Sequence, residues 1–173
     1  TLGGYFGDKS GEKGGLKGRV FFLTLILIAE GIILSLFSMA GSLIIAILLL
    51  TAFSLAVQMA EGATFAVVPF INKKAIGSIS GIVGAGGNVG AFFAALFLKI
   101  KSVAAEEAAI AANQGRNNEI VEAARASASS AAISDAFIWI GFSILAAGLI
   151  SLAIRFSKED EKEAALELRH QNA

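Results

Sequence analysis

The residues that most clearly suggest a binding function lie between Gly77 and Gly90. They form the run Gly-Ser-Ile-Ser-Gly-Ile-Val-Gly-Ala-Gly-Gly-Asn-Val-Gly. Each interior glycine costs a helix in water roughly 0.5 to 1 kcal/mol relative to alanine, so this many glycines need a compensating role. Membrane helices supply one, because small residues let neighbouring backbones approach closely. The run therefore predicts a helix inside a bundle.

A helix turning about 100° per residue sorts these small residues into two faces. One face carries Gly77, Gly81, Gly84 and Asn88, and the roughly opposite face carries Gly86 and Gly90. An amide in hydrocarbon must be hydrogen-bonded, and beside exposed glycine backbone Asn88 could present donors to a small polar ligand. The alternative is a packing surface on which the amide bonds a neighbouring helix. The two roles are compatible.

Composition restricts the class of protein. The chain has 173 residues, of which 55% are hydrophobic and 16% charged, and its mean hydropathy is +0.73. These values indicate an integral membrane protein. The chain has no cysteine and one histidine, so thiolate nucleophiles, cysteine metal sites and histidine clusters are excluded. We therefore expect that the protein is not an enzyme and holds no metal or cofactor. The net charge of zero argues against nucleic acid as a partner.

The chain contains four apolar segments, which predict an all-α, polytopic membrane helix bundle. The expected transmembrane helices are residues 20–39, 42–70, 76–98 and 135–154. About 20 residues suffice to cross a hydrocarbon core of about 30 Å. The first two should form a tight hairpin through the uncharged turn at residues 40–42, and Pro69 should help to end the second.

The remaining segments are hydrophilic. Residues 1–19 read as a loop and residues 155–173 as a charged tail. The connection at residues 99–134 is rich in alanine, which favours helix, but residues 113–118 read as a break. We therefore expect two short helices there. No linker divides the chain, so residues 1–173 are treated as a single, incomplete membrane domain.

The lysines and arginines near the spans predict the orientation, since short loops rich in these residues tend to stay cytoplasmic. They are Lys9, Lys13, Lys17, Arg19, Lys73, Lys74, Arg155 and Lys158. All of them fall on one side of the four-span arrangement. Both chain ends are accordingly expected in the cytoplasm, and residues 99–134 outside.

Glycines and charges in the opening segment follow the spacing Gly4-x-x-x-Asp8-Lys9-x-Gly11-x-Lys13. This spacing resembles the conserved loop between the second and third helices of each half of major facilitator superfamily transporters. In that superfamily the aspartate and basic residues act as a cytoplasmic latch. The resemblance implies the same role for these five residues.

Three further runs narrow the resemblance: Ala60-Glu61-Gly62-Ala63-Thr64-Phe65, Val68-Pro69-Phe70, and Gly81-Ile82-Val83-Gly84-Ala85-Gly86-Gly87-Asn88-Val89-Gly90-Ala91. With the latch spacing and the four spans, they are similar to the nitrate/nitrite porter family, specifically its high-affinity nitrate uptake branch. The run from Gly84 to Gly90 is similar to that family's nitrate signature in helix eleven. The resemblance covers residues 1–98, and the long connection departs from the shorter one common in the family.

The resemblance implies secondary active transport of nitrate, or nitrite, by alternating access. The chain would supply helices nine to twelve, part of the C-terminal half of a major facilitator fold. Anion-binding residues would be Gly84, Gly86, Gly87 and Asn88. The family also holds its anion with arginines from helices two and eight, which this chain lacks. We therefore expect a fragment whose partners are the missing N-terminal part, the anion, the lipid bilayer and, as a candidate co-substrate, protons, in the plasma (inner) membrane.

Two acids, Glu30 and Glu61, lie within apolar spans. An ionisable group there is costly and is by default a functional candidate, so either could carry a proton with the anion. Glu61, in the family-like run, is the stronger candidate for coupling. The alternative for both is a salt bridge or hydrogen bond to a neighbouring helix.

Two other functions remain open from the sequence. A major facilitator transporter of another small solute would keep the latch and the spans, but would have little reason for the run from Gly84 to Gly90. A structural or interaction membrane protein would explain the glycines, but not the latch or the acids within the spans.

Overall fold

The computed structural model describes residues 2–71 and 73–171, and among these it contains helices and no strand. The α-helices are α1 (Leu2–Ser38), α2 (Leu43–Phe65), α3 (Ile76–Ala112), α4 (Asn118–Ser151) and α5 (Lys158–Gln171). Two short 3-10 helices, η1 (Val68–Phe70) and η2 (Lys73–Ala75), lie between α2 and α3. The predicted all-α class is confirmed.

Within the described residues, four helical segments are long and apolar enough to cross a membrane, as the sequence predicts. They are Leu2–Ser38, Leu43–Phe70, Ile76–Ala112 and Asn118–Ser151. The chain is thus a polytopic helix bundle, as a piece of a major facilitator fold would be. Helices α3 and α4, of 37 and 34 residues, are about 50 to 55 Å long at 1.5 Å per residue, which exceeds a hydrocarbon core of about 30 Å. They must extend beyond the membrane.

The prediction of a loop over residues 1–19 was wrong for the described residues, because α1 already begins at Leu2. Gly15 interrupts the helix with a φ of 62° and a ψ of −149°, a conformation that glycine adopts without steric cost. The segment before Gly15 is helical because its glycines fit against α2. A methyl group at Gly7 would lie only 3.3 Å from the Ala66 side chain.

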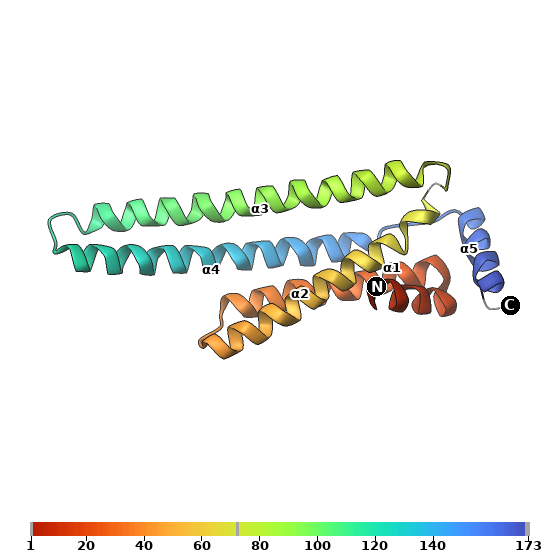
Figure 1. Ribbon diagram of the computed structural model, residues 1–173, viewed down its shortest axis with the longest axis horizontal. Coiled ribbons are helices and arrows are strands. Elements are labelled where there is room, and N and C mark those ends of the chain that lie inside the picture. The colour runs from red at the N-terminus through yellow and green to blue at the C-terminus, as the bar shows by residue number, and fades with distance from the viewer. Residues whose placement is uncertain (1, 72, 172–173) are drawn as a thin grey trace.

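Helix α1 packs against both α2 and α4 (Figure 1). Against α2, Leu23 is buried together with Ala60 and Ala63. Against α4, small residues allow close contact, since a methyl group at Gly31 would lie 2.7 Å from the Gly141 carbonyl oxygen.

Helices α3 and α4 form a long antiparallel hairpin that reaches past α1 and α2 (Figure 1). The break predicted within residues 113–118 is confirmed, since α3 ends at Ala112 and α4 begins at Asn118. The separate short helices predicted for residues 99–134 were wrong, because α3 and α4 continue through them. The Arg125 Nε donates to Glu106 Oε2 at 2.8 Å, and the Ser102 and Ser129 hydroxyls are 2.6 Å apart. These contacts join the two extensions.

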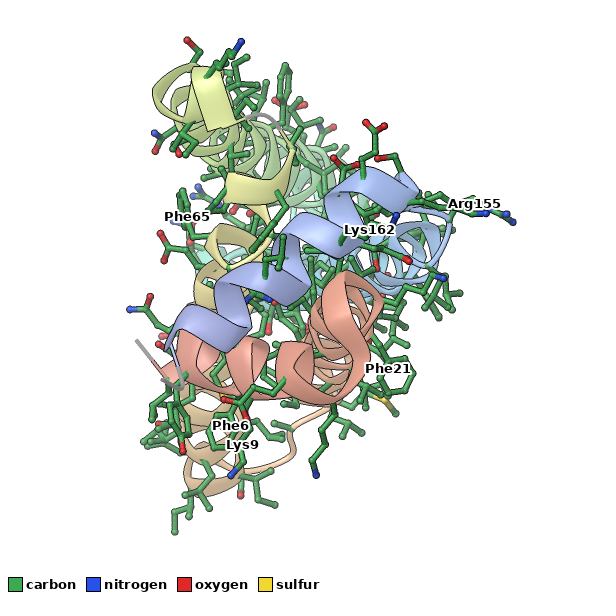
Figure 2. All side chains as sticks on the ribbon, turned by 90° about the vertical axis from the view of Figure 1, so that its right-hand side faces the viewer. Phe6, Lys9, Phe21, Phe65, Arg155 and Lys162 are labelled. Atoms are coloured by element: carbon green, nitrogen blue, oxygen red, sulfur yellow. The ribbon has the colours of Figure 1, made fainter. Side chains whose placement is uncertain are left out.

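The charged tail predicted for residues 155–173 contains a helix, α5. Its Ala164 is buried with Leu16 and Phe70, and the Lys17 Nζ lies 3.2 Å from Glu161 Oε1. Seen from this end of the bundle, α5 lies across α1, with Lys162 on α5 (Figure 2). The tail is therefore anchored to the part of α1 just after Gly15 and to η1.

Candidate functional site

A polar cluster near the expected membrane boundary centres on Arg19 in α1. Its side chain is 7% exposed, and Nη2 lies 3.1 Å from Asp8 Oδ1. Nη1 donates to the Ala66 carbonyl oxygen at 2.6 Å, and the guanidinium carbon stands 4.6 Å from the centre of the Phe70 ring. One cation thus joins the segment before Gly15 to the end of α2 and to η1.

The Arg19 cluster includes two of the five predicted latch residues, Asp8 and Gly11, and a third, Gly4, faces α2. Asp8 supplies the carboxylate, and a methyl group at Gly11 would lie 2.5 Å from Arg19 Nε, so Gly11 makes room for the arginine. At Gly4, a methyl group would stand 3.8 Å from the Gly62 carbonyl oxygen of α2. Lys9 instead lies 5.9 Å from the centre of the Tyr5 ring, and Lys13 is exposed.

Sequence reasoning missed the role of Arg19. A usable signal existed, because Arg19 directly precedes the apolar run that starts at Val20. A charged residue at that boundary often extends its side chain to the membrane surface. Only the folded chain shows that this side chain turns inward, to a carbonyl 47 positions away.

The glycine face of α3 is open. No atom of another element would lie within 4 Å of a methyl group at any of its six glycines, which are Gly77, Gly81, Gly84, Gly86, Gly87 and Gly90. No residue of α3 is buried. The described part of the chain therefore leaves the predicted anion-binding residues Gly84, Gly86, Gly87 and Asn88 accessible.

The amide of Asn88 is exposed and donates from Nδ2 to the Gly84 carbonyl oxygen of its own helix at 3.2 Å. Its side-chain oxygen accepts no hydrogen bond from the described residues. The local bond orients the amide along the glycine face. An interhelical bond, the alternative considered from the sequence, is not formed within the described chain.

The two acids within the spans have different environments. Glu30 is buried, with 8% of its surface exposed, and no described residue forms an ion pair with it. Glu61 is exposed and, with Gln58 and Gly62, lines a cavity of about 460 Å³ beside the start of α1. Because α2 does not pack along α3, Glu61 and Asn88 belong to separate surfaces in this part of the protein.

Among the described residues, no group of three histidine, cysteine, aspartate or glutamate side chains could hold a metal ion. The polar groups that remain available are backbone groups beside the α3 glycines, an amide, and carboxylates. These groups bind and orient small solutes through hydrogen bonds and charge. The described helices that are long and apolar enough to cross a membrane indicate an integral membrane protein.

Comparisons with curated proteins confirm the resemblance to nitrate transporters. The chain is 39% identical over 89 residues to high affinity nitrate transporter 2.5 of Arabidopsis thaliana, a match that covers 51% of this chain and 18% of that protein. It is 38% identical over 92 residues to nitrate transporter 2.1 of Chlamydomonas reinhardtii, covering 53% and 17%. It is 44% identical over 91 residues to the nitrate/nitrite transporter NrtP of Picosynechococcus, covering 51% and 16%.

The chain thus spans less than a fifth of the length of these relatives. No protein-family model matches the sequence, and no solved structure matches it.

Proposed function

We propose that this chain is part of a secondary active transporter for nitrate, or nitrite, that works by alternating access. The names of the relatives support the solute, and the open glycine and asparagine face of α3 carries the proposal for the site. Transport requires binding and release without covalent chemistry, which suits the groups present. In this proposal residues 1–173 form one part of a larger membrane domain.

The chemistry of nitrate suits the α3 face. Nitrate is planar and singly charged, so it is held best by several donors fixed in direction. Bare glycine positions let the anion approach the helix backbone, and the Asn88 amide can turn a donor towards it. Arginines from the remainder of the transporter, which the family resemblance implies, would supply the opposite charge. Rocking of one half against the other would then expose the anion to each side in turn.

The Arg19 cluster provides the candidate conformational latch. Asp8, Ala66 and Phe70 converge on one guanidinium, so moving the first segment of α1 relative to α2 would break an ion pair and a hydrogen bond together. Contacts made in only one conformation bias the equilibrium towards it. We propose that the cluster stabilises one of the two states of the transport cycle.

Nitrate uptake by the full-length protein carrying Asn88→Ala tests the site. Uptake should fall much further than membrane abundance, because the variant lacks the amide N–H groups that donate to the anion. Asn113→Ala is a matched control, since Asn113 also donates to a carbonyl four residues earlier, at 2.8 Å, but lies in the turn after α3. Unchanged affinity and rate in Asn88→Ala would make the amide structural only.

Steric substitutions test the same surface independently. Gly84→Leu or Gly87→Leu should block the close approach of the anion, while leaving abundance intact because both positions are open in this chain. Competition by other small anions and neutral solutes would separate nitrate transport from transport of a different solute. A protein that moves none of them would favour the interaction role instead.

The same proposal places both chain ends and Lys74 in the cytoplasm and the turn around Gly115 outside, at the plasma (inner) membrane. The distribution of lysine and arginine supports this orientation. In intact cells, an impermeant thiol reagent should modify Gly115→Cys but spare Lys74→Cys. The reverse pattern of labelling would overturn the orientation.

A further inference from the structure

A groove of about 820 Å³ runs between α3 and α4, separate from the Arg19 cluster. Its walls are mainly apolar and aromatic, and they include Phe93, Phe97, Trp139, Ile140, Ile144 and Ala147. Trp139 is 63% exposed. Large exposed apolar surfaces of this kind mark binding sites or membrane contacts.

One end of the groove carries a cation. Lys101 belongs to the lining, and its Nζ lies 5.8 Å from the centre of the Phe97 ring. No described residue forms an ion pair with Lys101, while the nearby carboxylate of Glu106 is paired with Arg125. Lys101 follows the apolar segment that ends at Leu98, and lysines at the ends of spans lie at the level of the lipid headgroups.

On α3, the lining of the groove extends over about one leaflet. Its lining on α3 extends from Lys101 to Gly90, a rise of about 16 Å at 1.5 Å per residue. This is half of a hydrocarbon core of about 30 Å. A transmembrane helix lying along the groove would need contacts over the whole span, whereas a lipid acyl chain needs them over one leaflet.

The groove has a closed end beyond the lysine. There, the hydroxyls of Ser102 and Ser129 are 2.6 Å apart, and Arg125 binds Glu106. These contacts hold α3 and α4 together just beyond the apolar segment. A headgroup at Lys101 would therefore lie at the junction of a polar closure and an apolar groove.

We propose that this groove binds one anionic phospholipid, with an acyl chain against Phe93, Phe97 and Ile144 and the headgroup phosphate at Lys101. The lipid would separate α3 from α4 over one leaflet and leave the Asn88 face free, because Asn88 points about 150° away from the groove-lining residues of α3. This site depends on membrane insertion and not on which solute is transported.

Fluorescence quenching of Trp139 in the full-length protein tests the site. The protein is reconstituted with phosphatidylglycerol or phosphatidylcholine brominated on the acyl chains, and the Trp139 signal is the difference from Trp139→Phe. Brominated phosphatidylglycerol should quench at about fivefold lower mole fraction, because one lysine near an anionic lipid contributes roughly that preference. Lys101→Gln should remove the preference, and Lys101→Arg should keep it.

Lys99→Gln is the matched control, because it removes the same charge two residues earlier, about 160° around the helix. It should keep the preference, and Ala147→Phe, which fills the groove, should weaken quenching by both lipids. Equal quenching by the two lipids in the unmodified protein would overturn the proposal. So would an equal loss in Lys99→Gln and Lys101→Gln, or no quenching by either lipid, which would indicate that protein fills the groove.

Discussion

Glycines occupy contrasting environments in the two parts of the bundle. Where α1 meets α2 and α4, a methyl group at Gly31, Gly62 or Gly141 would lie within 3 Å of a neighbouring atom. On α3, a methyl group at any of six glycines would meet nothing within 4 Å. Glycine therefore allows helices to pack closely in one region and leaves the helix surface uncovered in the other.

The contrast distinguishes glycines that pack helices together from glycines whose surface contacts no other part of the described chain. Glycines that bring helices together need no ligand to explain them. Six unpacked glycines in one helix weaken that helix without any packing gain in this chain. In the proposed function, the anion and the remainder of the protein supply this compensation.

The largest expected effect comes from Gly31→Leu in the α1–α4 contact. A methyl group there would lie 2.7 Å from the Gly141 carbonyl oxygen, and overpacking of this kind costs about 3 kcal/mol. Membrane abundance and thermal stability of the full-length protein should fall sharply. Gly81→Leu, on the open face of α3, is the control and should keep abundance. Equal losses would show that the α3 face is static packing surface.

A smaller loss is expected when the Arg19 cluster is broken. Arg19→Ala removes a buried hydrogen bond and ion pair, and should lower stability by about 2 kcal/mol. Asp8→Asn should cost about 1 kcal/mol, because the Asp8 side chain is 54% exposed. Lys13→Gln, at an exposed position, should be neutral in the same thermal denaturation measurement. If Arg19→Ala denatures like Lys13→Gln, the cluster is not a latch.

The acids should affect coupling more than stability. Glu30→Gln should abolish most proton-driven nitrate accumulation while keeping abundance, because Glu30 is buried and unpaired among the described residues. Glu61→Gln, at the acid that the sequence favoured for coupling, should have the smaller effect, since that side chain is exposed here. Accumulation driven by an imposed pH gradient measures both. Full accumulation in both variants would exclude these acids as proton carriers.

The smallest effect is expected at the contact of α5. The Lys17 side chain is 76% exposed and that of Glu161 is 37% exposed in their ion pair, and exposed pairs contribute about 0.2 to 1 kcal/mol. A double-mutant cycle of Lys17→Ala and Glu161→Ala measures this energy. A coupling energy well above that range would contradict the expectation that this pair acts as an ordinary exposed ion pair.

Much of the architecture was predictable because hydropathy and backbone preference act locally. The apolar runs predicted four spans, and the break within residues 113–118 was placed correctly. The helical start of α1 was not predicted, because its glycines and charges favour a loop in isolation. Contact of Gly7 with α2 outweighs that preference.

The sequence by itself determined which residues share the α3 glycine face, because helical spacing alone decides this. Only the tertiary structure decided that this face stays bare while Gly31 and Gly141 meet. It alone turned Arg19 towards Ala66, 47 positions away, and placed the Thr24 hydroxyl 2.6 Å from that of Ser151, 127 positions away. The physical reason is that such contacts depend on how whole helices pack, which no local pattern of residues specifies.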